Sequence, residues 1–240
     1  MAIVLLAWLY LVRLAGEMDE MTAMGMAMPQ MASWDALELL LGFLMWTVMT
    51  VAMMVPSAAP MILLFATMNR ERRDSQPPYV ATGAFLLGYL VVWMAYAAAA
   101  TLAQWGLHSV ALLSPDTLTV STATGGLLLL AAGVYQWTPL KRVCLAHCRS
   151  PLGFLMSCWR EGPWGAFRMG ARHGSYCVGC CWVLMALLFV AGVMNLLWVG
   201  ALAALVLVEK TVPRGELVSR TTGVGLIVAG VALLSQLMMS

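Results

Sequence analysis

The chain has 240 residues, of which 62% are hydrophobic and 10% are charged, whereas a soluble domain carries about 25% charged residues. So few charged side chains cannot cover a water-facing surface, which excludes a soluble globular protein and indicates an integral membrane protein. The net charge of +2 is small, and we expect no nucleic-acid partner.

Apolar segments long enough for membrane helices follow one another along the chain. A helix needs about 20 apolar residues to cross a hydrocarbon core of about 30 Å. The candidate spans are residues 2–15, 37–68, 79–107, 117–137, 177–193, 196–208 and 221–237. The first is short, but it lacks the basic start and cleavage site of a signal peptide. We therefore predict an all-α, polytopic transmembrane bundle of about seven helices, which forms one domain over residues 1–240.

The segment 177–208 could be one overlong helix or a tight hairpin that turns at residues 193–195. Lys and Arg are enriched in cytoplasmic loops. Basic clusters follow the second span, separate the fourth from the fifth, and precede the last. Only a hairpin places all three clusters on one side of the membrane. We therefore predict the hairpin, with the N-terminus inside and the C-terminus outside.

The predicted outer loop after the first span is rich in methionine. It reads EMDEMTAMGMAMPQM and contains Met18, Met21, Met24, Met26, Met28 and Met31. Thioethers bind Cu(I) and bind harder ions poorly. Alternatively, the loop lies flat on the membrane and uses its methionines as flexible apolar contacts.

The second span combines a methionine face with two prolines. Met45, Met49 and Met53 are spaced four residues apart and share one helical face. Together with the outer loop they suggest a relay of soft ligands across the membrane. Pro56 and Pro60 predict a kink, which neighbouring polar side chains can stabilise by binding the freed carbonyls.

The predicted cytoplasmic loop, residues 141–176, is rich in glycine but also carries several large apolar residues. An amphipathic segment buries such residues in the headgroup region. We therefore predict a short interfacial helix at about residues 152–160, with a re-entrant segment as the alternative.

All six cysteines lie between Lys141 and Trp182, on the predicted cytoplasmic side. Thiols stay reduced there, which argues against a structural disulfide framework. On helices, Cys144 shares a face with Cys148 and Cys177 shares a face with Cys181. His147 and Cys180 lie close beside these pairs. The predicted metal ligands are Cys144, Cys148, Cys177, Cys180, Cys181 and, as an auxiliary, His147.

Thiolates select soft or borderline ions, so Cu(I) or Zn(II) is the expected metal. His173, four residues before Cys177, could join such a site, or it could be an ordinary loop histidine. The cysteines could also be redox pairs or small apolar packing residues. Phosphate-binding loops, HExxH sequences and nucleophile elbows are not found in the sequence. We therefore do not expect an ATP-driven pump, and enzymatic activity is less favoured than binding.

Three segments resemble a bacterial family known as predicted metal-binding integral membrane proteins, a domain of unknown function. They read MWTVMTVAMMVPSAAPM, AAGVYQWTPLKRVCLAHCRSP and GSYCVGCCWVLMALLFVAGVMNLLWV, the last followed by EK. Their specific motifs are K-x2-C-L-x2-C-R-x-P and C-x-G-C-C-W. The resemblance covers about residues 34–210 and implies metal binding at the five cysteines of these motifs. It also implies a bacterial inner-membrane location and, since a small second protein often accompanies the family, a heteromeric complex.

The leading prediction is a membrane protein that binds and transports a soft metal ion, copper first and zinc second. One alternative is a membrane thiol–disulfide oxidoreductase that passes electrons through the cysteine pairs. The other is a structural membrane subunit of a heteromeric complex, whose cysteines only pack.

Overall fold

The computed structural model describes residues 2–23, 35–71, 78–110, 112, 119–193 and 195–239. The regular elements in these residues are helices, so the all-α prediction is confirmed. They are α1 (Ala2–Ala23), α2 (Ala36–Glu71), α3 (Pro78–Ser109), α4 (Thr122–Tyr135), α5 (Pro139–Arg149), α6 (Pro151–Cys158), α7 (Gly162–Ala186), α8 (Leu188–Ala191), α9 (Leu196–Thr211) and α10 (Gly215–Met239). Within the described ranges α7 and α8 form one 30-residue unit, which gives nine helices instead of about seven.

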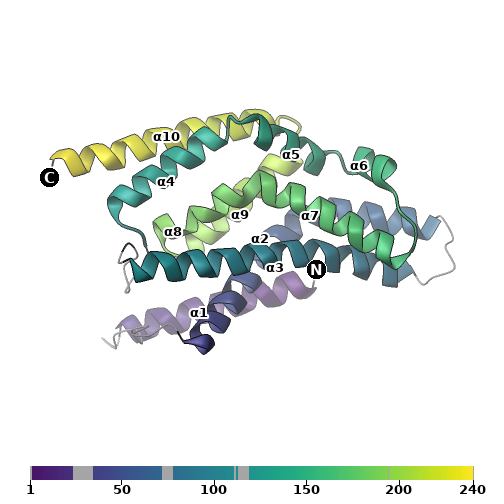
Figure 1. The fold of residues 1–240 in the computed structure, drawn as a ribbon, viewed down its shortest axis with the longest axis horizontal. Coiled ribbons are helices and arrows are strands. Elements are labelled where there is room, and N and C mark those ends of the chain that lie inside the picture. Colours follow the sequence, from purple (N-terminus) through teal and green to yellow (C-terminus); the bar gives the residue numbers. More distant parts are fainter. Residues whose placement is uncertain are drawn as a thin grey trace.

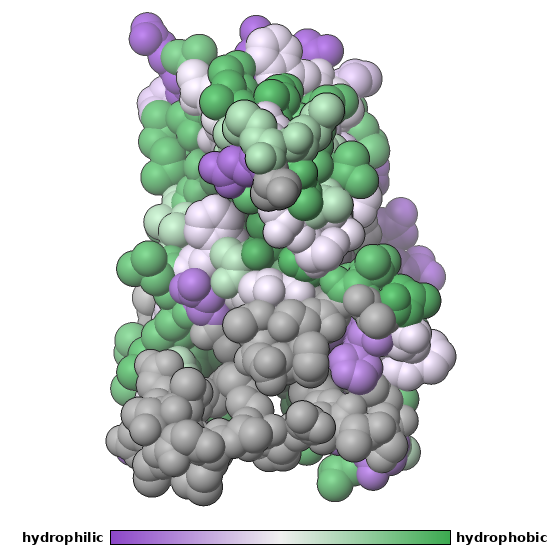
Figure 2. All heavy atoms as spheres, turned by 90° about the vertical axis from the view of Figure 1, so that its left-hand side faces the viewer, coloured by the Kyte–Doolittle hydropathy of each residue, from purple (hydrophilic) through white to green (hydrophobic). Residues whose placement is uncertain are grey.

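Four of the described helices are long and apolar enough to cross a membrane. They are Ala36–Glu71, Val80–Ser109, Gly162–Ala191 and Gly215–Met239. Leu6, Leu63, Leu127 and Val228 are each at least 60% exposed, as expected where lipid replaces water. Among the residues that Figure 2 colours by hydropathy, hydrophobic ones cover much of the surface and hydrophilic ones are scattered between them. The composition and these helices together support a membrane protein.

The helices lie roughly along the long axis of the molecule (Figure 1). The helix α7 packs against α3 and α5, while α2 packs against α1, α3 and α9. A separate pair, α4 and α10, forms the upper arm in Figure 1 and ends at the C-terminus. The centre of α7 is therefore enclosed by several helices.

The prediction of a glycine-rich loop at residues 141–176 is wrong, because this segment is helical almost throughout. Residues Pro139 and Pro151 begin α5 and α6 at their first turns, where proline is favoured. A short helix is found in this segment as α6, which runs from Pro151 to Cys158 instead of about residues 152–160; its interfacial position stays a prediction. The helix α7 begins at Gly162 rather than at Cys177, so the fifth predicted span starts too late.

Glycines inside α7 serve close helix packing rather than loop flexibility. A Cβ atom at Gly170 would overlap the Phe85 carbonyl of α3, and one at Gly88 would overlap the Phe167 carbonyl of α7. Small residues permit such close approach between membrane helices. This close packing of α3 against α7, which we call the glycine seam, explains why a glycine-rich segment is helical here.

The hairpin in segment 177–208 is confirmed. Helix α8 ends at Ala191, Gly192 adopts a φ of 91°, and Asn195 caps the start of α9. A positive φ favours glycine because it lacks a Cβ atom. Met194, inside this turn, lies outside the described residues.

Two of the predicted spans begin or end at other residues in the structure. Helix α1 runs to Ala23 rather than to residue 15, so Met18 and Met21 belong to a helix and not to a loop. Helix α4 begins at Thr122 rather than at residue 117. The other methionines of the first loop lie outside the described residues, namely Met24, Met26, Met28 and Met31.

The prolines of α2 free backbone carbonyls inside the bundle. Proline at position 56 removes the donor for the Ala52 carbonyl. The indole of Trp8 in α1 donates to this oxygen at 3.1 Å. Helix α1 therefore replaces the lost backbone hydrogen bond and is held against α2.

Candidate metal centre

Three thiols occupy the buried middle of α7. Cys177 and Cys181 are both 0% exposed, and Cys180 lies between them on the same side of the helix. The sequence placed Cys177 at the mouth of a helix. Because α7 begins at Gly162, these residues instead lie well inside the bundle.

Helix α5 brings a fourth thiol to these three. The Sγ atom of Cys148 lies 3.9 Å from that of Cys180, which lies 3.2 Å from that of Cys181. Cys177 lies one helical turn before Cys181 on the same buried face of α7. The two cysteine turns therefore meet, which the sequence left open. We call these four residues the thiol cluster.

The other predicted ligands lie around the thiol cluster. Cys144 packs against Gly179, where a Cβ atom would lie 2.7 Å from its Sγ atom, and burial raises the pKa of its thiol. His147 points elsewhere, because its ring stacks on Tyr176 with centroids 4.2 Å apart and its Nδ1 bonds to the Val143 carbonyl. All six cysteines are free thiols.

Two of the sulfur separations allow a simple test of fit. Thiolate–metal bonds of about 2.3 Å place neighbouring sulfur atoms about 3.8 to 4.0 Å apart in tetrahedral or trigonal sites. The separation of 3.9 Å between Cys148 and Cys180 matches this range, whereas 3.2 Å between Cys180 and Cys181 is shorter. In the described ranges, no three cysteine, histidine or carboxylate side chains already form a metal site. The donor chemistry fits a soft ion, and small side-chain movements must complete its coordination.

A buried lysine supplies positive charge at the thiol cluster. The ammonium of Lys210, on α9, donates to the Cys177 sulfur and to the Ser57 hydroxyl, both at 2.9 Å. Tyr89 of α3 lies 3.1 Å from the same sulfur and donates to the Met54 carbonyl at 3.1 Å. Helices α3 and α9 thus contact Cys177 of α7 directly, while Met54 and Ser57 of α2 bind the Tyr89 and Lys210 side chains that do so.

A buried ion pair positions α5. The ammonium of Lys141 lies 2.8 Å from a carboxylate oxygen of Glu209 on α9, and both side chains are 1% exposed. At the other end of α5, Arg149 donates to the Val212 and Pro213 carbonyls, which follow α9. These contacts fix α5 on α9 and so place Cys148 beside α7.

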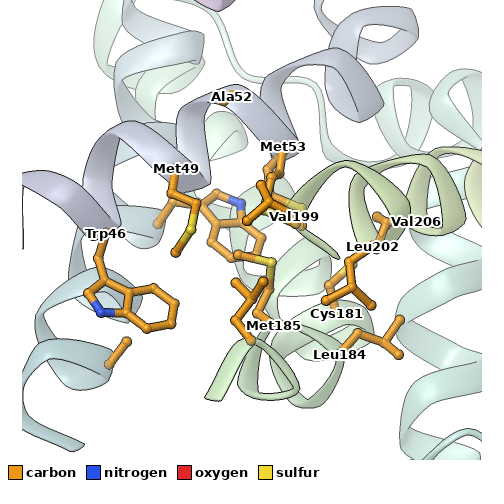
Figure 3. Packing of buried hydrophobic residues seen from close by; sticks show 14 of the residues in the cluster. Trp46, Met49, Ala52, Met53, Cys181, Leu184, Met185, Val199, Leu202 and Val206 are labelled. Carbon is orange, nitrogen blue, oxygen red and sulfur yellow. The ribbon is translucent and has the colours of Figure 1, made fainter. Parts of the chain in front are cut away.

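Two methionines of the predicted relay lie close to the thiol cluster. Figure 3 shows Met49 and Met53 of α2 gathered with Met185 and Cys181 of α7, beside residues of α9. The three methionines are at most 1% exposed. Met45 is only partly buried and packs against the same core. Thioethers therefore lie between the start of α2 and the thiols.

Sequence reasoning missed Tyr89 and the role of Lys210. Lys210 was visible as an ionisable residue near a helix end, where snorkelling to the interface is the ordinary explanation. A lysine that follows Glu209 directly was a signal, because two adjacent charges on a helix cannot face the same way. For Tyr89 the sequence carries no comparable signal.

Comparison with known proteins adds one result. A family model described as PpoB2, copper chaperone, matches residues 43–233, whereas no curated protein and no solved structure matches the chain. The match supports the expectation of a metal-related family. Because it covers well over half of the chain, the protein belongs to the PpoB2 copper chaperone family.

Proposed function

We propose that this protein binds Cu(I) at the thiol cluster and passes it on within the membrane. The observation that carries the proposal is the approach of Cys148 of α5 to Cys180 of α7, which in turn contacts Cys181. Thiolates are preferred ligands of Cu(I), and the family is described as a copper chaperone. These two facts favour copper over zinc.

The neighbouring predicted ligands have secondary roles in this proposal. Cys144 is a fifth thiol one turn along α5, and its sulfur faces Gly179 of α7. His147 lies at the partly exposed edge of the same helix. Both can receive the ion after the thiol cluster, on its way out of the bundle.

The proposed route begins at the methionines. Met18, Met21, Met24, Met26 and Met28 collect the ion, and Met45, Met49 and Met53 carry it along α2. The burial of Met49 and Met53 beside Cys181 supports the second step. The proposed location is the bacterial inner membrane, with the N-terminus inside, the C-terminus outside and a small accessory protein as partner.

The test measures the copper content of the purified full chain. A Cys177→Ser/Cys180→Ser/Cys181→Ser variant should lose at least about tenfold in bound copper, because serine is a hard ligand. Cys158→Ser is the matched control: in the described residues its thiol contacts the Ser157 hydroxyl and packs against the apolar cluster around Phe65 and Phe85, not against the thiol cluster, so this variant should keep its copper. Equal copper in the triple variant and in the unmodified protein would overturn the proposal.

The same samples test the redox alternative. A metal site protects the thiols from alkylation until a chelator is added. A redox pair instead responds to dithiothreitol and ignores the chelator. If serine substitutions leave both copper content and copper tolerance intact, the cysteines only pack.

A further inference from the structure

His173 lies on α7, one helical turn before Cys177, and so shares a face with it. The side chain is 2% exposed. The sequence allowed either a metal ligand or a loop histidine. The structure excludes the loop, because α7 is continuous through this residue.

The surroundings of His173 are aromatic. Its ring lies 5.8 Å from that of Tyr89, 6.3 Å from Phe85 and 5.7 Å from Phe154, measured between centroids. In the described part of the chain its Nδ1 atom is buried and has no hydrogen-bond partner. Leaving a buried polar atom unpaired costs free energy, so apolar packing alone does not explain a histidine here.

The position of His173 connects this nitrogen with the thiol cluster. Its ring stacks on Tyr89, whose hydroxyl lies 3.1 Å from the Cys177 sulfur. Neutral imidazole is a good ligand for copper. The unpaired nitrogen is thus one turn away from a sulfur atom that the proposed function assigns to Cu(I).

We propose that His173 is a nitrogen ligand of the bound Cu(I), which it shares with the thiolates of the cluster. This inference rests on the proposed function. The imidazole binds through the lone pair of Nδ1 and carries its proton on Nε2, so no electron transfer or further reactant is involved. Copper binding then supplies the partner that Nδ1 otherwise lacks.

His108, in the last turn of α3, provides the matched control. It lies 19 residues, about 28 Å of helix, beyond Tyr89 on the same helix, and neither the thiol cluster nor the proposed route includes it. His108→Phe should therefore leave the coordination of the cluster unchanged. His173→Phe keeps an aromatic ring among Phe85, Tyr89 and Phe154 and removes both ring nitrogens.

The experiment is X-ray absorption spectroscopy of the full-length protein loaded with Cu(I), combined with competition titrations. The unmodified protein should show sulfur ligands and the outer-shell scattering of an imidazole. His173→Phe should lose the imidazole signal and about tenfold in affinity, while His108→Phe keeps both. The metal-free His173→Phe protein should melt at the same temperature as the unmodified protein or higher, because an unpaired buried nitrogen has been removed.

The possible failures separate the two proposals. A sulfur-only shell in the unmodified protein overturns the role of His173 and leaves copper binding by the thiols intact. An unchanged spectrum and affinity in His173→Phe does the same. A protein that binds no Cu(I) at all overturns both proposals, and the triple cysteine variant then matches the unmodified protein.

Discussion

Two buried lysines, Lys141 on α5 and Lys210 on α9, meet different partners. Lys141 is 0% exposed and pairs with the Glu209 carboxylate at 2.8 Å. Lys210 is 8% exposed and donates to the Cys177 sulfur and the Ser57 hydroxyl. One lysine is bound to a permanent anion, whereas the other shares its partner with the proposed metal ion.

The different partners of Lys141 and Lys210 indicate two roles for a buried charge: one stabilises the fold, and the other acts at the proposed metal site. Lys141 and Glu209 are each other's partners whether or not an ion is bound at the thiol cluster. A free thiol has a pKa of about 8.5, so its charge at neutral pH depends on what it contacts. The Lys141 pair therefore holds the fold, and Lys210 is suited to respond to what binds at Cys177.

The largest expected effect is that of Lys141→Met on stability. Removing one partner of a buried ion pair typically costs about 3 to 5 kcal/mol, because the other charge stays buried and unpaired. We expect a loss of this size in the free energy of unfolding, measured by denaturation in mild detergent with circular dichroism. Lys210→Met, which removes an equally buried ammonium, should lose clearly less, and equal losses would break the comparison.

The second effect is that of Lys210→Met on copper binding. Loss of a group that contacts a ligand from outside typically lowers metal affinity 10- to 100-fold. We expect a decrease of about this size in competition titrations with a Cu(I) chelator. Lys141→Met, examined under conditions where it remains folded, should lose less affinity than Lys210→Met, because it loosens only the docking of α5, which carries one of the four thiols. A Lys210→Met protein with full affinity would show that this lysine, too, is only structural.

The smallest effect is expected when both partners of the structural pair are replaced. Apolar residues of similar volume often substitute for a buried ion pair without loss of stability. Lys141→Met/Glu209→Leu should therefore regain most of the stability lost in the single variant and unfold within about 1 kcal/mol of the unmodified protein. A double variant as unstable as Lys141→Met would mean that the pair also contributes hydrogen bonds that no apolar residue can replace.

The sequence predicted the elements that depend on local hydrophobicity. The long spans of α2 and α3 and the hairpin before α9 were predicted close to their observed bounds. The start of α7 was not, because Gly165, Gly170 and Gly174 suggest a loop unless a neighbouring helix is known to pack on them.

For the metal centre, the sequence identified the thiols but not their geometry. Helical spacing groups Cys177 with Cys181, but the approach of Cys148 depends on how α5 docks on α9 through Lys141 and Arg149. Tyr89 is separated from Cys177 by 88 residues, so no local pattern links them. Contacts of this kind require the tertiary structure.

The glycine seam between α3 and α7 affects which mutations can disturb the thiol cluster. Gly88 immediately precedes Tyr89, and Gly174 is three residues before Cys177. A Cβ atom at Gly88 would overlap the Phe167 carbonyl, and one at Gly174 would lie 3.1 Å from the Tyr89 carbonyl oxygen. We therefore expect a substitution there to shift α7, which carries three of the thiols. A genetic screen for copper-sensitive strains would then return glycine substitutions. Such substitutions keep all three cysteines of α7 in the sequence but move their sulfur atoms together.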